Sequence, residues 1–190
     1  MSDPFVEVVP AAALQVRAGQ LGAELGAAYE DTVPVFVGVL KGCVPFMADL
    51  VRGYPGDLEV DFLSLTRFGN DGRVGIAMDI ATPLKGRDVV IVEDIVDTGL
   101  TLTTLRRVLE TRDPASISTV ALLDKAPRRI VDVPVEYRGF EVGDEFLLGY
   151  GLDWNGWYRN VPSLWAVMDL GELTRDHRSF AAASRAMATG

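Results

Sequence analysis

Two acidic residues and a short run of glycine and threonine stand close together near the middle of the chain. Glu93 and Asp94 end an apolar segment, and the run DTGLT follows at residues 97–101. The glycine of this run lets a ligand approach the backbone closely, and its two threonines provide hydroxyl groups. A helix that begins here adds free N–H groups and the positive end of its dipole. The run is therefore typical of a phosphate-binding cradle.

The acidic pair suits another part of the same ligand. Carboxylates accept hydrogen bonds from vicinal hydroxyls, as on a ribose, or coordinate Mg²⁺. Taken singly, each feature also fits a strand that ends in two solvated acids and is followed by a helix N-cap. As one continuous run, these residues favour a sugar-phosphate site.

The elements that position these residues alternate between apolar strands and amphipathic helices. Strands are predicted at residues 33–40, 58–65, 72–80, 86–94, 117–125, 135–140 and 164–170, and helices at 10–28, 44–52 and 100–109. This order predicts an α/β fold with a mainly parallel sheet and helices on both of its faces. Ligands bind beyond the carboxyl ends of such strands, which is where the acidic pair and the DTGLT run would lie.

The length and the tail of the chain indicate its domain organisation. A chain of 190 residues predicts a single domain, residues 1–190, with its core over about residues 33–170. The alanine-rich residues 179–190 are expected to form a frayed tail.

Charge and cysteine content narrow the classes of partner. The chain has 18 Lys and Arg against 27 Asp and Glu, a formal net charge of −9. Such a chain lacks the field that holds nucleic acid or an anionic membrane, so a small anionic substrate has to be bound locally. Cys43 is the only cysteine, which excludes an intramolecular disulfide and a multi-cysteine zinc site. We expect a reduced, cytoplasmic protein without a membrane-spanning segment.

A family resemblance extends these inferences. The segment VVIVEDIVDTGLT (residues 89–101) resembles the phosphoribosyl-pyrophosphate (PRPP) signature of type I phosphoribosyltransferases. Residues 38–52, 61–65, 121–129 and 131–162 resemble the hypoxanthine-guanine phosphoribosyltransferases, in the order of that family. The pattern F-x-x-G-Y-G-L-D, with L-L-D-K upstream, is the part most specific for 6-oxopurine enzymes. The likeness covers residues 35–167.

The resemblance implies a fold and a reaction. The fold would be that of type I phosphoribosyltransferases, with a mainly parallel central sheet flanked by helices and a small hood. The activity would be purine salvage, in which the phosphoribosyl group of PRPP moves to N9 of hypoxanthine, and of guanine, to give IMP or GMP and pyrophosphate. Mg²⁺ would be the cofactor, and the chain would form a homodimer or homotetramer.

The resemblance also assigns residues to PRPP. Lys41 and Gly42 resemble the pyrophosphate loop, in which the peptide bond between those two residues is cis. Arg159 would contact pyrophosphate as well. The acidic pair would hold the ribose hydroxyls directly or through Mg²⁺. The residues implied to bind the 5′-phosphate are Thr98, Gly99, Leu100 and Thr101.

The remaining assignments concern the base and the metal. Lys125 would donate to purine O6, Phe146 would stack on the base, and Leu147 would meet its edge through the backbone. Asp97 would be the catalytic residue at purine N7, and Asp153 would join Glu93 and Asp94 as a metal ligand.

Other interpretations of these residues stay open from sequence alone. Lys125 also fits a surface lysine, Phe146 a core residue, and Asp153 with Arg159 a surface ion pair. For Phe146 a loop is expected, because two acidic residues precede it and a glycine follows at residue 149. A regulatory PRPP-fold protein that binds RNA is a second hypothesis, which the acidic composition disfavours. A transferase for xanthine or a pyrimidine is a third.

One departure from the family pattern affects the lid. After the DFLSL segment the family has a Ser-Tyr pair on a long loop, whereas this chain has Arg67 and Phe68 and a short stretch at residues 69–73. A cation thus replaces a tyrosine hydroxyl. Arg67 is a candidate to close onto the pyrophosphate, and a solvated surface arginine is the alternative.

Overall fold

The computed structural model describes residues 3–68 and 73–188, and the side chains of residues 67–68, 73–74 and 186–188 are outside this description. The helices are α1 (Ala11–Ala28), α2 (Val44–Gly53), α3 (Leu100–Glu110), α4 (Leu170–Arg175) and α5 (Arg178–Ala188), with a 3-10 turn, η1, at Ala126–Arg128. The strands are β1 (Phe5–Val9), β2 (Val35–Leu40), β3 (Glu59–Phe68), β4 (Arg73–Met78), β5 (Asp88–Val96), β6 (Ser116–Asp124), β7 (Tyr137–Glu141), β8 (Phe146–Leu148) and β9 (Leu164–Val167). Within the described residues, no helix has the length and apolar character required to span a membrane.

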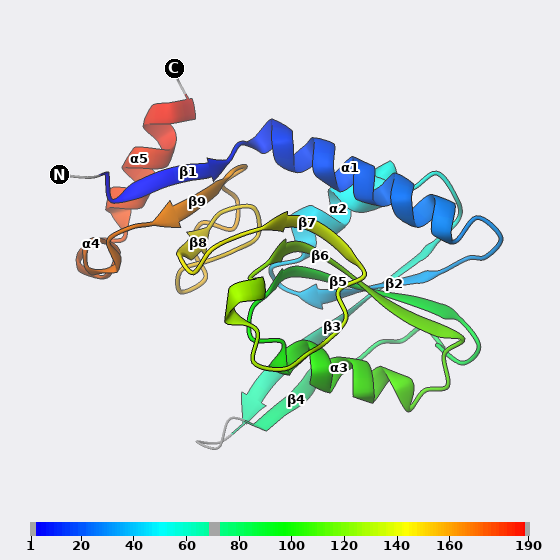
Figure 1. Ribbon diagram of the computed structural model, residues 1–190. Helices are drawn as coiled ribbons and strands as arrows, with labels where there is room; N and C mark the ends of the chain where they lie inside the picture. Colours follow the sequence, from blue (N-terminus) through cyan, green and yellow to red (C-terminus); the bar gives the residue numbers. More distant parts are fainter. Residues whose placement is uncertain (1–2, 69–72, 189–190) are drawn as a thin grey trace.

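A six-stranded sheet in the order β4-β3-β2-β5-β6-β7 forms the centre of the molecule (Figure 1). β3, β2, β5, β6 and β7 run parallel, and only the edge strand β4 is antiparallel to its neighbour. The parallel strands end at one edge of the sheet. The predicted α/β fold with a mainly parallel sheet is thus confirmed.

The central parts of β2, β5 and β6 are apolar because helices cover both of their faces. Phe36, Val90 and Val92 pack with the buried residues of α1 and α2 on one face. Val35 and Ile91 pack with the buried leucines of α3 on the other. Figure 1 shows α1 and α2 together on one side of the sheet and α3 on the opposite side.

A second, three-stranded sheet in the order β1-β9-β8 forms the hood. Both of its strand pairs are antiparallel, and Phe5 of β1 lies opposite Val167 of β9. Sequence analysis did not predict β1, because five alternating residues at the start of the chain carry little periodic signal. β1 forms because it pairs with β9, and no local sign of this is present in the sequence because β9 lies far away along the chain.

The C-terminal segment corrects one expectation. Instead of a frayed tail at residues 179–190, the structure has helix α5 through Ala188. The physical reason is Phe180, which is fully buried. Its ring packs edge-on against Phe5, Tyr158 and Trp165, with centroid distances of 5.3, 4.9 and 5.8 Å. This aromatic cluster fastens α5 to the hood.

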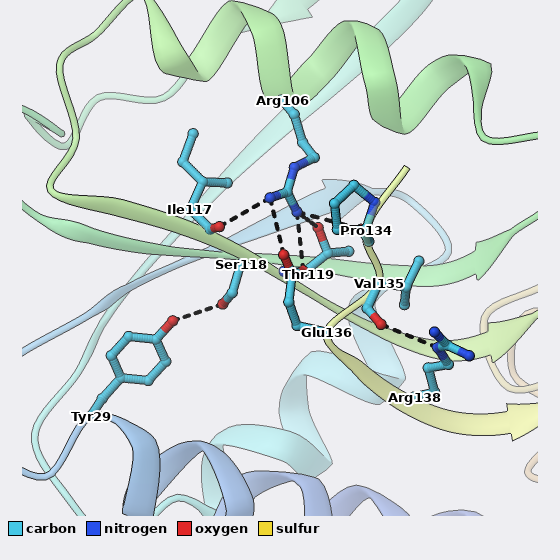
Figure 2. A network of polar contacts seen from close by, with 9 residues as sticks. All are labelled: Tyr29, Arg106, Ile117, Ser118, Thr119, Pro134, Val135, Glu136 and Arg138. Atoms are coloured by element: carbon cyan, nitrogen blue, oxygen red, sulfur yellow. Dashed lines mark hydrogen bonds and ion pairs between the residues drawn. The ribbon is translucent and has the colours of Figure 1, made fainter. Parts of the chain in front are cut away.

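Arg106 joins α3 to β6 by hydrogen bonds and to the segment just before β7 by an ion pair (Figure 2). Arg106 forms two hydrogen bonds of 3.1 Å to the two carboxylate oxygens of Glu136. It also donates to the hydroxyl of Thr119 at 2.8 Å and the carbonyl of Ile117 at 3.1 Å. Glu136 in turn accepts the backbone N–H of Thr119 at 2.7 Å. The network fixes α3, and with it the turn at the start of α3, against β6.

Arg106→Ala is expected to lower the free energy of unfolding by about 2–3 kcal/mol, because it leaves Glu136 and Thr119 without their charged partner. Urea denaturation followed by circular dichroism measures this. Arg107→Ala is the matched control, since Arg107 is exposed on the same helix. Equal stability of the two variants would contradict the role given to the Arg106 network.

Candidate active site

The DTGLT run forms the turn between β5 and α3 and lines a cavity of about 230 Å³. Gly99 has φ 83°, and a Cβ there would lie 2.9 Å from the side chains of Arg129 and Val133. Only glycine suits this position, because the conformation is left-handed and the space is filled. Leu100 begins α3, and the first N–H groups of a helix have no partner within the helix. The residues that line the cavity are Glu93, Ile95, Val96, Asp97, Thr98, Gly99, Thr101 and Leu102.

The acidic pair lies within β5, close to the end of this strand. Glu93 is only 6% exposed, and burial together with the nearby Asp94 raises its pKa well above the usual range. Burial also raises the pKa of Asp94 to about 6, although the backbone N–H of Ile95 donates to Asp94 at 2.9 Å. Two adjacent desolvated carboxylates form a region that a cation or a set of hydroxyl donors would stabilise.

The loop after β2 lies directly against this pair. A Cβ at Gly42 would fall 1.5 Å from Oδ2 of Asp94, so any side chain at position 42 would displace the carboxylate. Gly42 is buried while Lys41 is exposed. The cis peptide bond joins Leu40 to Lys41, not Lys41 to Gly42 as the resemblance implied. The cis bond therefore lies where β2 ends, and Gly42 is the residue that lies against the carboxylate of Asp94.

Residues of the hood reach the same place. A Cβ at Gly151 would lie 1.9 Å from the carbonyl oxygen of Gly42, so these two loops touch through their backbones. Arg159 donates to the carbonyl of Gly151 at 2.6 Å and pairs with Asp153 at 2.6 Å. The charge of Arg159 lowers the pKa of Asp94 while that of Asp153 raises it, both less than burial does. The structure therefore brings the two predicted hood residues beside the acidic pair, already joined in an ion pair.

The predicted purine residues lie together at the edge of the hood. Lys125 directly follows β6 and is only 6% exposed, and its Nζ donates to the carbonyl of Glu145 at 2.5 Å. Phe146 is half-buried and contacts Trp154 edge-on, with ring centroids 5.5 Å apart. Leu147 is buried and pairs with β9. Phe146 was expected on a loop, but it begins the short strand β8, because the segment pairs with β9.

Asp97 has a partner that sequence analysis did not predict. Nε of Arg128 lies 2.8 Å from Oδ1 of Asp97, and Nη1 of Arg128 lies 2.7 Å from Oδ1 of Asp144. The neighbouring Arg129 donates to the backbone carbonyl of Asp97 at 3.0 Å and pairs with Asp124. The sequence signal for this partner was the pair of consecutive arginines, Arg128 and Arg129, just after the end of β6. Their partners depend on how two distant loops approach each other.

The candidate lid falls outside what the structure describes. Arg67 belongs to β3, but its side chain and residues 69–72 are not among the described parts. Its proposed contact with pyrophosphate therefore stays a prediction.

Comparisons with known proteins identify the class of this fold and site. A family model described as "Phosphoribosyl transferase domain" matches residues 12–155. The chain belongs to the phosphoribosyltransferase family, which confirms the resemblance found in the PRPP signature.

Individual relatives are more specific. The chain is 46% identical over 153 residues to a hypoxanthine-guanine phosphoribosyltransferase of Bacillus subtilis, which covers 78% of this chain and 85% of that protein. It is 42% identical over 174 residues to a hypoxanthine phosphoribosyltransferase of Salmonella typhimurium, at 88% and 98% coverage. A crystal structure of a hypoxanthine-guanine phosphoribosyltransferase from Bacillus anthracis has a TM-score of 0.83 and 37% identity, covering 85% of this chain and 98% of that one.

The raised pKa of Asp94 predicts a pH-dependent stability. In the folded state the pKa of Asp94 is about 6, whereas in the unfolded chain it is near the usual value of 3.8. The folded state therefore favours the protonated carboxyl of Asp94. The stability that this protonated form contributes is lost as pH rises from 4 to 7, because the ionised carboxylate opposes folding. Relative to wild type, Asp94→Asn should gain about 1–3 kcal/mol of unfolding free energy over this interval, without Mg²⁺.

Urea titrations at several pH values measure this difference. The exposed Asp132→Asn serves as the control for a change of one charge. A difference between Asp94→Asn and wild type that stays constant from pH 4 to 7 would refute the raised pKa.

Proposed function

We propose that the protein transfers the 5-phosphoribosyl group of PRPP to N9 of a 6-oxopurine, hypoxanthine or guanine, with release of pyrophosphate. The observation that carries this proposal is the meeting of two half-sites at one sheet edge. The turn after β5 provides a sugar-phosphate cradle, and Lys125 with Phe146 provides a purine platform. The names of the relatives support the same reaction.

The sugar-phosphate half binds the donor substrate. The backbone N–H groups and hydroxyls of residues 98–101 receive the 5′-phosphate, helped by the dipole of α3. Glu93 and Asp94 accept hydrogen bonds from the ribose hydroxyls. The desolvation of these carboxylates makes such donors more favourable than they are in water.

The leaving pyrophosphate is stabilised by cations at the other side of the ribose. Lys41 is exposed beside the acidic pair, and Arg159 is held there by Gly151 and Asp153. Loss of pyrophosphate leaves positive charge on the ribose and negative charge on the leaving group, so catalysis depends on positioning and electrostatics. The two cations face the negative charge, and the two buried carboxylates face the positive one.

The donor set also fits Mg²⁺. This cation prefers carboxylate oxygens together with water and substrate phosphates, and it seldom needs an all-protein cage. In the described residues, no group of three or more His, Cys, Asp or Glu is close enough to hold a metal by itself. Glu93, Asp94 and Asp153 would thus hold Mg²⁺ jointly with PRPP. When bound, the ion supplies positive charge to the pyrophosphate in a protein of net charge −9.

The purine half selects the base and handles its proton. Lys125 is held by Glu145 through one hydrogen of its ammonium group, and two further hydrogens remain to meet O6. Phe146 offers a ring whose position is fixed by Trp154. Asp97 accepts the proton of N7, which shifts electron density toward N9 as the new bond forms. Leu147 contributes only its backbone to the base edge.

Steady-state assays with PRPP, Mg²⁺ and a panel of bases test the function. Hypoxanthine and guanine should react, and adenine should react about 10⁴-fold more slowly, because its amino group would face the donors of Lys125. Excess chelator should abolish turnover. Adenine turnover similar to that of hypoxanthine would refute the role of Lys125, and reaction with a pyrimidine alone would refute the function.

Asp97→Asn tests the chemical step. This variant keeps the shape of the side chain but loses the proton acceptor, so kcat should fall by about 10²-fold or more while KM for PRPP changes little. Asp144→Asn is the control, because Asp144 pairs with the same arginine but is not assigned to the reacting atoms. The assignment fails if the kcat of Asp97→Asn stays within a few-fold of wild type.

A further inference from the structure

A second cavity, of about 490 Å³, lies at the edge of the sheet where the parallel strands begin, away from the candidate active site. β2 connects the two places, since it starts beside the cavity and ends at Lys41. The residues that line it are Gly26, Tyr29, Glu30, Asp31, Thr32, Val33, Tyr54, Pro55, Gly56 and Asp57. No sequence motif and no step of the proposed reaction uses them.

Two helices end at this cavity. Tyr29 is the C-cap of α1 and Tyr54 is the C-cap of α2, so the negative ends of both helix dipoles meet here. The last turn of α1 contains no basic residue. Arg52, in the last turn of α2, is paired with Asp49. The backbone by itself therefore makes the cavity attractive to a cation.

The side chains add to this negative potential. Glu30, Asp31 and Asp57 are exposed, and within the described part of the chain no cation forms an ion pair with any of them. None of the residues that line the cavity is basic. The nearby Arg87 is engaged by Glu59 and by the carbonyl of Val33, at 2.8 and 2.9 Å.

Tyr54 gives an independent indication of a ligand. It is only 7% exposed, and among the described residues its hydroxyl has no hydrogen-bond partner. A Cβ at Gly56 would lie 3.6 Å from this hydroxyl, and Tyr29 and Asp57 raise its pKa after burial does, so the hydroxyl faces the cavity. Tyr29 differs, because its hydroxyl is turned away to Ser118 at 2.8 Å (Figure 2). The hydroxyl of the otherwise buried Tyr54 is therefore open to the cavity, where a ligand can form a hydrogen bond with it.

We propose that this cavity binds an extended aliphatic amine with more than one ammonium group, a cation of the polyamine class. A single metal ion is disfavoured, because these acids do not converge as a metal-ligand group in the described chain. Separated carboxylates match separated ammonium groups instead. The methylene groups between the ammonium groups of the ligand contact the rings of Tyr29 and Tyr54 and the side chains of Pro55 and Val33. The hydroxyl of Tyr54 accepts a hydrogen bond from one ammonium group.

Isothermal titration calorimetry of the full chain with spermidine, at low ionic strength and without substrate, tests this proposal. We expect saturable binding at one site, with Kd of about 1 mM or below. Asp31→Asn and Asp57→Asn should each weaken binding about fivefold or more, and Tyr54→Phe, which removes only the hydroxyl, about threefold. Glu110→Gln, an exposed acid on α3, removes the same charge and should leave the affinity unchanged.

Several results would overturn the proposal. One is absence of binding up to about 10 mM spermidine. Another is equal weakening by Asp57→Asn and Glu110→Gln, which would indicate only diffuse attraction to an acidic protein. A third is competition by Mg²⁺ at equal charge concentration, which would indicate a simple counter-ion effect. None of these outcomes depends on phosphoribosyl transfer, so a failure here leaves the proposed function untouched.

Discussion

The contact between Gly42 and the carboxylate of Asp94 joins the loop after β2 to strand β5 in the candidate active site. Oδ2 of Asp94 occupies the position that a Cβ at residue 42 would take, and the carbonyl of Gly42 in turn occupies the position of a Cβ at Gly151. Three chain segments thus meet through atoms that no side chain separates. The acidic pair, the loop after β2 and the hood can converge only because glycine stands at two of these points.

Charge distribution follows from that packing. Burial raises the pKa values of Glu93 and Asp94, and the charge of Arg159 offsets this only in part, at Asp94. Arg159 is held on the hood side, and Arg128 on the purine side, each already bound to aspartate. A chain of net charge −9 thus still places positive groups beside the acidic residues of the candidate site.

The sequence predicted those parts of the fold whose partners are near in the chain or whose burial is complete. The ends of β2 and β6 were predicted to within two residues, because helices cover both faces of the sheet and the central positions of these strands are apolar. β8 is only three residues long and pairs with the hood, so Phe146 looked like a loop residue. α5 depends on one aromatic anchor, Phe180, in an otherwise alanine-rich segment. In the site, the residues at strand ends were predictable from topology. The ion pairs of Arg128 were not, since they join loops that the sequence keeps apart.

The pairing of β1 with β9 determines the order in which the parts of the molecule fold. Phe5 lies opposite Val167, so β1 cannot pair until β9, the last of the described strands, has been synthesised. The six-stranded sheet has all of its strands before that point, since β7 ends at Glu141. Domains fold during synthesis from the N-terminal side, and contacts between distant residues form slowly. The turn after β5 therefore belongs to the part of the molecule that can fold early, and the hood is completed last.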